Sequence, residues 1–140
     1  MSHHASSNCW PCLTKAPRVR RNEPVTPTVL RLAFVAALVA SFALALLPSP
    51  DLPAEVDHAD KIAHFIAYFG LGALGLFVWP RHALPVCVLL LTHGALVELA
   101  QSLTDYRQGD IWDWLADAAG VAAALAVHQL LRYWKRNPRT

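Results

Sequence analysis

The sequence predicts an all-α polytopic membrane protein with four transmembrane helices. Apolar residues make up 55% of its 140 residues and charged residues only 16%, against about 25% in an ordinary soluble domain. Its long uncharged stretches are close to the roughly 20 residues that a helix needs to cross a bilayer core. The charges are also sorted along the chain. Ten of the 12 Lys and Arg residues lie in residues 15–31, at Arg81 or in residues 132–139, whereas nine of the ten Asp and Glu residues lie between Asp51 and Asp117. A soluble surface mixes both signs, so this distribution indicates a membrane protein.

The apolar stretches set the expected helices, which are Val29–Leu47, Ile62–Trp79, Ala83–Leu103 and Trp114–Leu131. The first is expected to be a retained helix and not a cleaved signal peptide, because the segment after it lacks a small-x-small cleavage site. Pro48 and Pro80 end the first two spans, and Pro85 lies in the first turn of the third, where a missing N–H costs little. Tryptophans lie at span ends, as in interfacial belts. The alternative, a soluble four-helix bundle, would need a polar face along each helix.

The basic residues predict the orientation. Cytoplasmic flanks of membrane proteins are enriched in Lys and Arg. With four spans, the N-terminal tail, the turn at Arg81 and the C-terminal tail share one side, so both termini are expected in the cytoplasm. The loops 48–61 and 104–113 then face outward. The expected organisation is a disordered basic tail at 1–28, a transmembrane domain at 29–134 and a short basic tail at 135–140.

Two short motifs are given no catalytic or nucleotide-binding role. Cys9 and Cys12 form a CxxC, but neither a thioredoxin-like βαβ context nor a four-ligand zinc frame surrounds them. Residues 70–75 match G-x-G-x-x-G, but they lie inside an apolar helix with no strand before them. Gly72 and Gly75 are therefore expected to permit close helix packing. The basic tails carry no nucleic-acid readout motif, so no nucleic-acid partner is expected. The expected partner is the lipid bilayer, and no cofactor is assigned.

Ionisable and other polar residues at the predicted outer leaflet form the candidate site, because such groups are costly in a membrane and normally have partners. They come from three spans and the loop between two of them: Asp60, Lys61, His64, Glu98, Gln101, Arg107, Asp110, Asp113 and Asp117. Asp60 and His64 share a helix face with Tyr68. Asp110, Asp113 and Asp117 start a stripe that continues through small residues, although Asp110 or Asp113 could simply cap the fourth helix. Carboxylates outnumber cations, so either a carboxylate is protonated or a cation completes the site.

The spacing of these residues resembles the VanZ-like membrane proteins over residues 30–132. Their pattern, roughly E-x-x-Q-x5-R-x2-D-x2-D-x3-N-x2-G, is met by Glu98, Gln101, Arg107, Asp110, Asp113 and Gly120, with Asp117 where the family usually has Asn. The upstream block D-K-x-x-H-F-x-x-Y-x-x-L-G also matches, from Asp60 to Gly72. The resemblance implies a small multi-pass protein of the bacterial inner membrane. The founding member is linked to teicoplanin resistance, a role that we do not transfer to this chain.

Two hypotheses of different class follow. In the first, the cluster binds or acts on a lipid head group or a lipid-linked envelope precursor. Catalytic roles would fall to Glu98, as acid or base, with His64 as its proton partner, and to Arg107 and Asp113; the ligand-binding residues would be Lys61, Asp60, Gln101, Asp110 and Asp117. A divalent cation on His64, Glu98 and Asp113 is permitted but not required. In the second hypothesis the cluster only locks the helices of a transporter component or assembly partner, which could work as a homo-oligomer.

Overall fold

The structure, a computed structural model, describes residues 26–47, 57–105 and 109–137. The elements are α1 (Thr26–Ala45), α2 (Asp57–Val78), α3 (Ala83–Ser102) and α4 (Ile111–Arg136), with no strand among the described residues. All four helices are long and apolar enough to cross a membrane, so the predicted all-α, four-span class is confirmed. Residues 1–25 of the expected disordered tail 1–28, with Cys9 and Cys12, lie outside the described residues, as does Arg107. Residues 26–28 are the first residues of α1, so the prediction for this end of the tail is wrong.

Three helices extend beyond the apolar stretches that predicted them. α1 begins at Thr26 instead of Val29, although it ends at Ala45 instead of Leu47. α2 begins at Asp57 instead of Ile62, and α4 covers Ile111–Arg136 instead of Trp114–Leu131. Helical hydrogen bonding continues into the polar ends of a span, whereas apolar length measures only the part in hydrocarbon. Asp110 is the N-cap of α4, since its Oδ1 accepts the backbone N–H of Trp112 at 2.9 Å. The capping role considered for Asp110 is therefore confirmed.

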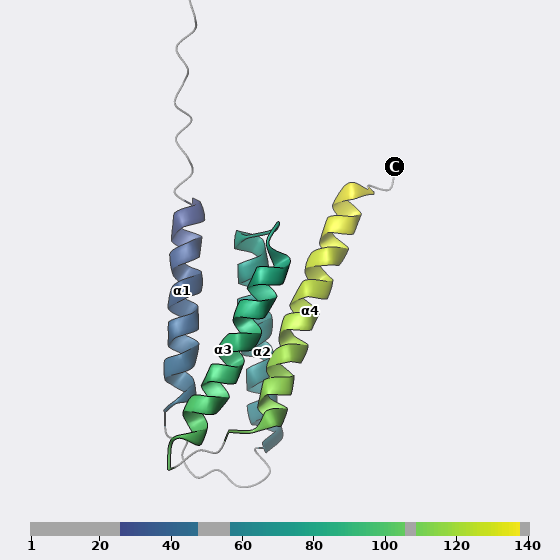
Figure 1. Ribbon diagram of the computed structural model, residues 1–140. Coiled ribbons are helices and arrows are strands. Elements are labelled where there is room, and N and C mark those ends of the chain that lie inside the picture. Colours follow the sequence, from purple (N-terminus) through teal and green to yellow (C-terminus); the bar gives the residue numbers. More distant parts are fainter. Residues whose placement is uncertain (1–25, 48–56, 106–108, 138–140) are drawn as a thin grey trace, which may run out of the picture.

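The helices alternate in direction, so α2 and α4 run parallel to each other (Figure 1). These two helices share the most extensive interface of the bundle. Glycines permit this close approach of α2 and α4. A Cβ on Gly72 would lie 2.8 Å from the Cβ of Ala124, and a Cβ on Gly120 would meet the backbone of Phe65 and Phe69. A Cβ on Gly75 would likewise lie 2.8 Å from Val86 Cγ1. The packing role predicted for Gly72 and Gly75 is confirmed.

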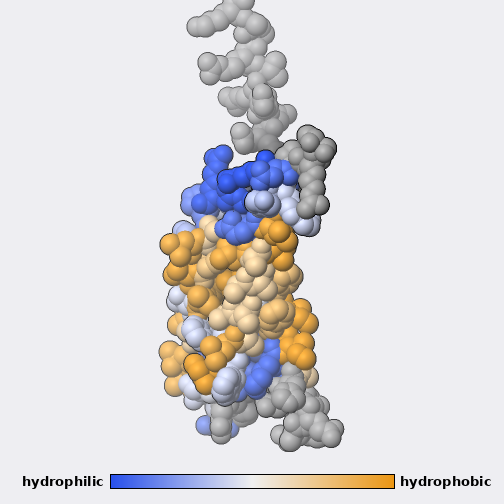
Figure 2. Space-filling model, turned by 90° about the vertical axis from the view of Figure 1, so that its right-hand side faces the viewer, coloured by the Kyte–Doolittle hydropathy of each residue, from blue (hydrophilic) through white to orange (hydrophobic). Residues whose placement is uncertain are grey.

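A small apolar core fills the space between the helices, and its buried members are Phe34, Tyr68, Leu71, Leu76, Val86, Leu90, Val121 and Ala124. Many large apolar side chains on all four helices are exposed. On the α4 side of the molecule they form a hydrophobic band between hydrophilic groups at the two ends (Figure 2). This distribution is that of helices whose outer surface contacts lipid.

The two ends of the bundle differ in charge. The start of α1, the α2–α3 turn and the end of α4 lie together at one end, which carries Arg31, Arg81, Arg132, Lys135 and Arg136 and is called the basic end (Figure 1). The start of α2, the end of α3 and the start of α4 lie together at the other, the acidic end. The Lys and Arg residues of the described chain, apart from Lys61, thus share one end, as the sequence predicted.

Candidate functional site

Charged side chains from three helices meet at the acidic end. Its members, called here the acidic-end cluster, are Asp60, Lys61, His64, Glu98, Asp110, Asp113 and Asp117. α2 supplies the first three from its first two turns, α3 supplies Glu98 near its end, and α4 supplies the rest from its N-cap and one face. The structure therefore brings together seven of the nine residues that the sequence selected.

The deepest contact of the cluster joins α2 to α4. His64 Nδ1 donates to Asp117 Oδ1 at 2.9 Å. The side chain of Asp117 is 0% exposed, and its second oxygen, Oδ2, has no hydrogen-bond partner among the described residues. The hydrogen bond of His64 thus goes to Asp117, whereas the sequence suggested Glu98 as its proton partner. A fully buried carboxylate with one unsatisfied oxygen is costly, and a binding site is one reason to keep it.

Lys61 holds the start of α4 against α2. Its Nζ lies 3.3 Å from Asp110 Oδ2 and 3.6 Å from Asp113 Oδ1. Asp110 therefore has two contacts, because its Oδ1 caps the helix while its Oδ2 pairs with the lysine. A partly exposed ion pair of this kind adds only about 0.2–1 kcal/mol to the stability of the fold. Its main effect is therefore to fix the positions of the Asp110 and Asp113 carboxylates relative to Lys61.

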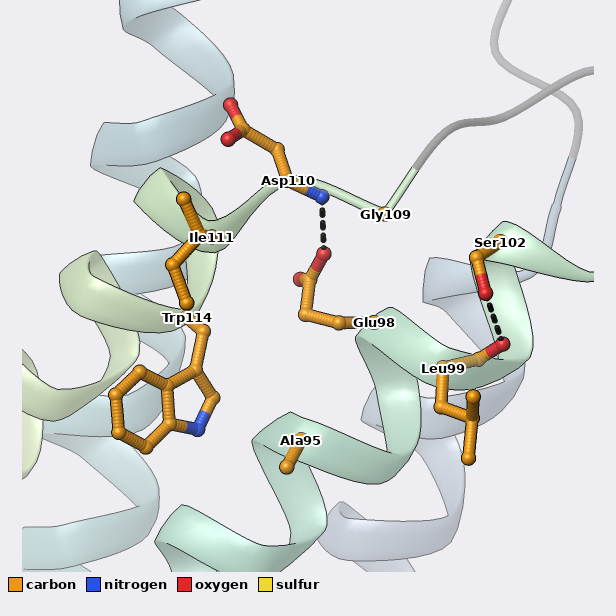
Figure 3. A pocket seen from close by; sticks show the side chains of 8 residues that line it. All are labelled: Ala95, Glu98, Leu99, Ser102, Gly109, Asp110, Ile111 and Trp114. Atoms are coloured by element: carbon orange, nitrogen blue, oxygen red, sulfur yellow. Dashed lines mark hydrogen bonds between the residues drawn. The ribbon is translucent and has the colours of Figure 1, made fainter.

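Glu98 lies at a pocket between α3 and α4. Its Oε2 accepts the backbone N–H of Asp110 at 2.7 Å, and its buried Oε1 has no hydrogen-bond partner within the described chain. The pocket has a volume of about 440 Å³ and is lined by Ala95, Glu98, Leu99, Ser102, Gly109, Asp110, Ile111 and Trp114. Glu98 and the backbone of Asp110 form its polar side, and the Trp114 ring and Ala95 lie deeper (Figure 3). A Cβ at Gly109 would lie 2.6 Å from the Glu98 carbonyl oxygen, so this close approach requires glycine.

A second pocket lies on the other side of the cluster, toward α1. Its volume is about 230 Å³, and its polar lining residues are Ser41, Asp60, His64 and Tyr68. The remaining lining is mostly apolar and comes from α1, α2 and α3. The cluster can therefore be approached from two sides of the bundle.

Gln101 lies apart from the cluster. Its Nε2 donates to the Ala45 carbonyl at 3.0 Å, which joins α3 to α1, and the residue is only 2% exposed. The sequence grouped Gln101 with the ligand-binding residues because it lies one turn from Glu98. In the structure Gln101 donates a hydrogen bond to Ala45 in α1, whereas Glu98 accepts one from Asp110 at the start of α4.

The sequence reasoning missed two features near Asp117. Tyr68 Oη donates to His93 Nδ1 at 2.8 Å, and His93 Nε2 donates to the Leu38 carbonyl at 3.1 Å, so one polar chain connects α2, α3 and α1. Gly94 leaves room beside the buried carboxylate, since a Cβ there would lie 2.7 Å from Asp117 Oδ2. The helical step from His64 to Tyr68 pointed to the first feature. A glycine within an apolar span was the only signal for the second.

Two groups in the cluster have a spacing that suits a metal ion. They are Asp60, His64 and Asp113, and His64, Glu98 and Asp117, and in each the potential ligand atoms lie within 4.8 Å of one another. The trio that the sequence considered, His64, Glu98 and Asp113, is divided between the two groups. Asp117 takes the place beside His64 and Glu98 because it lies one turn deeper on α4, opposite His64.

Four apolar helices with a charged cluster at one end define a small multi-pass membrane protein. The sequence model of the VanZ/LLP1 family matches residues 13–132, and the chain belongs to this family. No curated protein and no solved structure gives a match.

Proposed function

We propose that the acidic-end cluster binds the polar head group of an envelope lipid or a lipid-linked cell-wall precursor at the outer leaflet of the bacterial inner membrane. The observation that carries this proposal is Glu98, whose buried Oε1 has no hydrogen-bond partner in the described chain and which lines a pocket of about 440 Å³. A buried polar atom of this kind is costly, and a ligand that donates to it would remove the cost.

The lining of that pocket suits an amphiphile. Glu98 and Asp110 are polar and lie toward the helix ends, whereas Leu99, Ile111 and Trp114 are apolar. The indole of Trp114 is held in place, because its Nε1 donates to the Leu91 carbonyl at 3.1 Å. A head group would contact the polar part while a lipid tail followed the apolar surface of α3 and α4.

The cluster divides into groups with different expected roles. Lys61 and Arg107 would hold an anionic head group. Glu98 would exchange a proton with the ligand if the protein carries out a reaction. His64 and Asp117 would act as a pair, with the carboxylate fixing the ring, and Asp113 would set the position of Lys61.

The second candidate function is a polar lock without a ligand. The contacts of Gln101 with Ala45 and of His93 with Leu38 favour it, because each joins α1 to another helix and needs no other partner. We assign the locking role to these residues and the binding role to the acidic-end cluster.

Replacing Glu98 with glutamine tests this division. Glu98→Gln keeps the side-chain shape and can still accept the Asp110 N–H. We expect normal abundance in the membrane but no rescue of the envelope phenotype of a strain that lacks the gene. Gln101→Leu should instead lower abundance, because it removes the bond to Ala45 and costs about 1–2 kcal/mol.

Ser102→Ala is the matched control for Glu98→Gln, since Ser102 lines the same pocket and, among the described residues, its hydroxyl donates to the Leu99 carbonyl one turn earlier. It should rescue fully at normal abundance. Full rescue by Glu98→Gln would contradict the proposed binding role, and loss of abundance in that variant would favour the lock.

The proposed side of the membrane has its own test. A reporter fused after Asp57 is expected to be active outside the cytoplasm, and one fused after Arg81 inside it, because the basic end should be cytoplasmic. The reverse pattern would place the acidic-end cluster in the cytoplasmic leaflet and contradict the proposed outer-leaflet ligand.

A further inference from the structure

Two carboxylates from different helices lie beside His64, and each has one unsatisfied oxygen. Glu98 Oε1 on α3 and Asp117 Oδ2 on α4 are both buried and lack a hydrogen-bond partner among the described residues. A ring nitrogen of His64 and one oxygen from each of these carboxylates lie within 4.8 Å of one another. Acidic side chains often gather at surfaces, but here one carboxylate is 0% exposed. Burial with an unused oxygen therefore sets this group apart from a solvated acidic patch.

The excess of carboxylates in the cluster also favours a bound cation. Its described carboxylates are Asp60, Glu98, Asp110, Asp113 and Asp117, and its described basic groups are Lys61 and His64. An anionic head group placed among them would meet net repulsion. A divalent cation would neutralise the carboxylates and offer open coordination positions to phosphate oxygens, as metal ions do at many phosphate sites.

We propose that His64, Glu98 and Asp117 bind a divalent first-row cation such as Mn²⁺ or Zn²⁺. This inference deepens the proposed function, because the cation would be the group that attracts the head group. An imidazole with two carboxylates suits these ions better than Ca²⁺, which takes only oxygen ligands. Ligand atoms around such an ion lie roughly 3–3.5 Å apart, so small side-chain rotations would close the trio.

Gly94 is part of the same site. A Cβ at this position would lie 2.7 Å from Asp117 Oδ2 and 3.3 Å from Tyr68 Oη. The glycine thus preserves space beside the oxygen that the cation would use. Gly94→Ala removes no ligand and yet should weaken cation binding, which a purely electrostatic effect of the acidic cluster would not predict.

The test is Mn²⁺ binding to the full chain in detergent. Binding is measured as the loss of the EPR signal of free Mn²⁺. Mn²⁺ is the probe because thiolates bind it poorly, so Cys9, Cys12 and Cys87 do not interfere. Wild type should bind one Mn²⁺ per chain. Asp117→Asn, Glu98→Gln and Gly94→Ala should each weaken binding by at least roughly tenfold.

Matched controls separate the site from general charge and glycine effects. Asp105→Asn removes an exposed carboxylate near the same end, and Gly70→Ala adds a methyl group where nothing lies within 4 Å. Both should bind Mn²⁺ as wild type does. Circular dichroism of each variant confirms the helix content, and Glu98→Gln decides the matter if Asp117→Asn does not fold.

The outcomes distinguish the cation from the ligand. Absence of Mn²⁺ binding in wild type, or unchanged binding in Glu98→Gln, overturns the cation site even if a lipid head group binds. If wild type binds Mn²⁺ and the variants lose this binding, the cation site is supported, whether or not a lipid head group binds. If Mn²⁺ binds in this way but no lipid head group does, only the proposed function is overturned.

Discussion

Replacing Gly120 with valine is expected to lower the amount of folded protein in the membrane to less than about a tenth of wild type. A Cβ at this position would lie 2.9 Å from the Phe69 backbone nitrogen and would also meet the Phe65 carbonyl oxygen. Backbone atoms cannot rotate away, so α2 and α4 would have to separate along the most extensive interface of the bundle. Overpacking of this kind costs about 3 kcal/mol. Quantitative immunoblotting of membrane fractions measures the result.

Gly70→Val is the matched control for Gly120→Val. Gly70 lies on α2, and nothing lies within 4 Å of a Cβ built there. This variant should accumulate as wild type does, since valine is well tolerated on a lipid-facing surface. Equal abundance of the two valine variants would contradict the close α2–α4 packing on which the site depends.

Replacing His64 with leucine is expected to lower the free energy of unfolding by about 2–4 kcal/mol, because it leaves Asp117 buried without its 2.9 Å hydrogen bond. The loss of stability should come mainly from the buried Asp117 carboxylate that has lost its hydrogen-bond donor, and not from the missing contacts of the imidazole. Reversible unfolding in mixed micelles, with the protein free of added metal, measures the free energy.

A double-mutant cycle isolates this pair. In the Asp117→Ala background, His64→Leu should cost much less than it does in wild type, with a coupling energy of about 2 kcal/mol. Additive effects, within about 0.5 kcal/mol, would contradict a direct interaction between His64 and Asp117.

The spans and the position of the cluster could be predicted from the sequence because they depend on one-dimensional properties. Apolar length fixes what can cross a bilayer. Helical steps of three and four place Asp60 and His64 on one face, and Asp113 and Asp117 on another. Alternating directions then bring these ends together.

The pairings inside the cluster could not be predicted, because they depend on how each helix is rotated against its neighbours. Gly72 and Gly120 bring α2 close to α4, and this approach places His64 against Asp117. Gln101 contacts Ala45 for a similar reason, since α1 lies beside the end of α3. The close approach at Gly94 also appears only when the helices are packed, because it involves an atom from another helix.

The central claim is that the acidic-end cluster binds an anionic lipid head group. Binding of a polyprenyl phosphate to the purified full chain, with Mn²⁺ present, tests it most directly when wild type is compared with Glu98→Gln and Ser102→Ala. We expect saturable binding by wild type and Ser102→Ala, and binding weaker by at least roughly tenfold in Glu98→Gln. Equal binding by wild type and Glu98→Gln would contradict the claim.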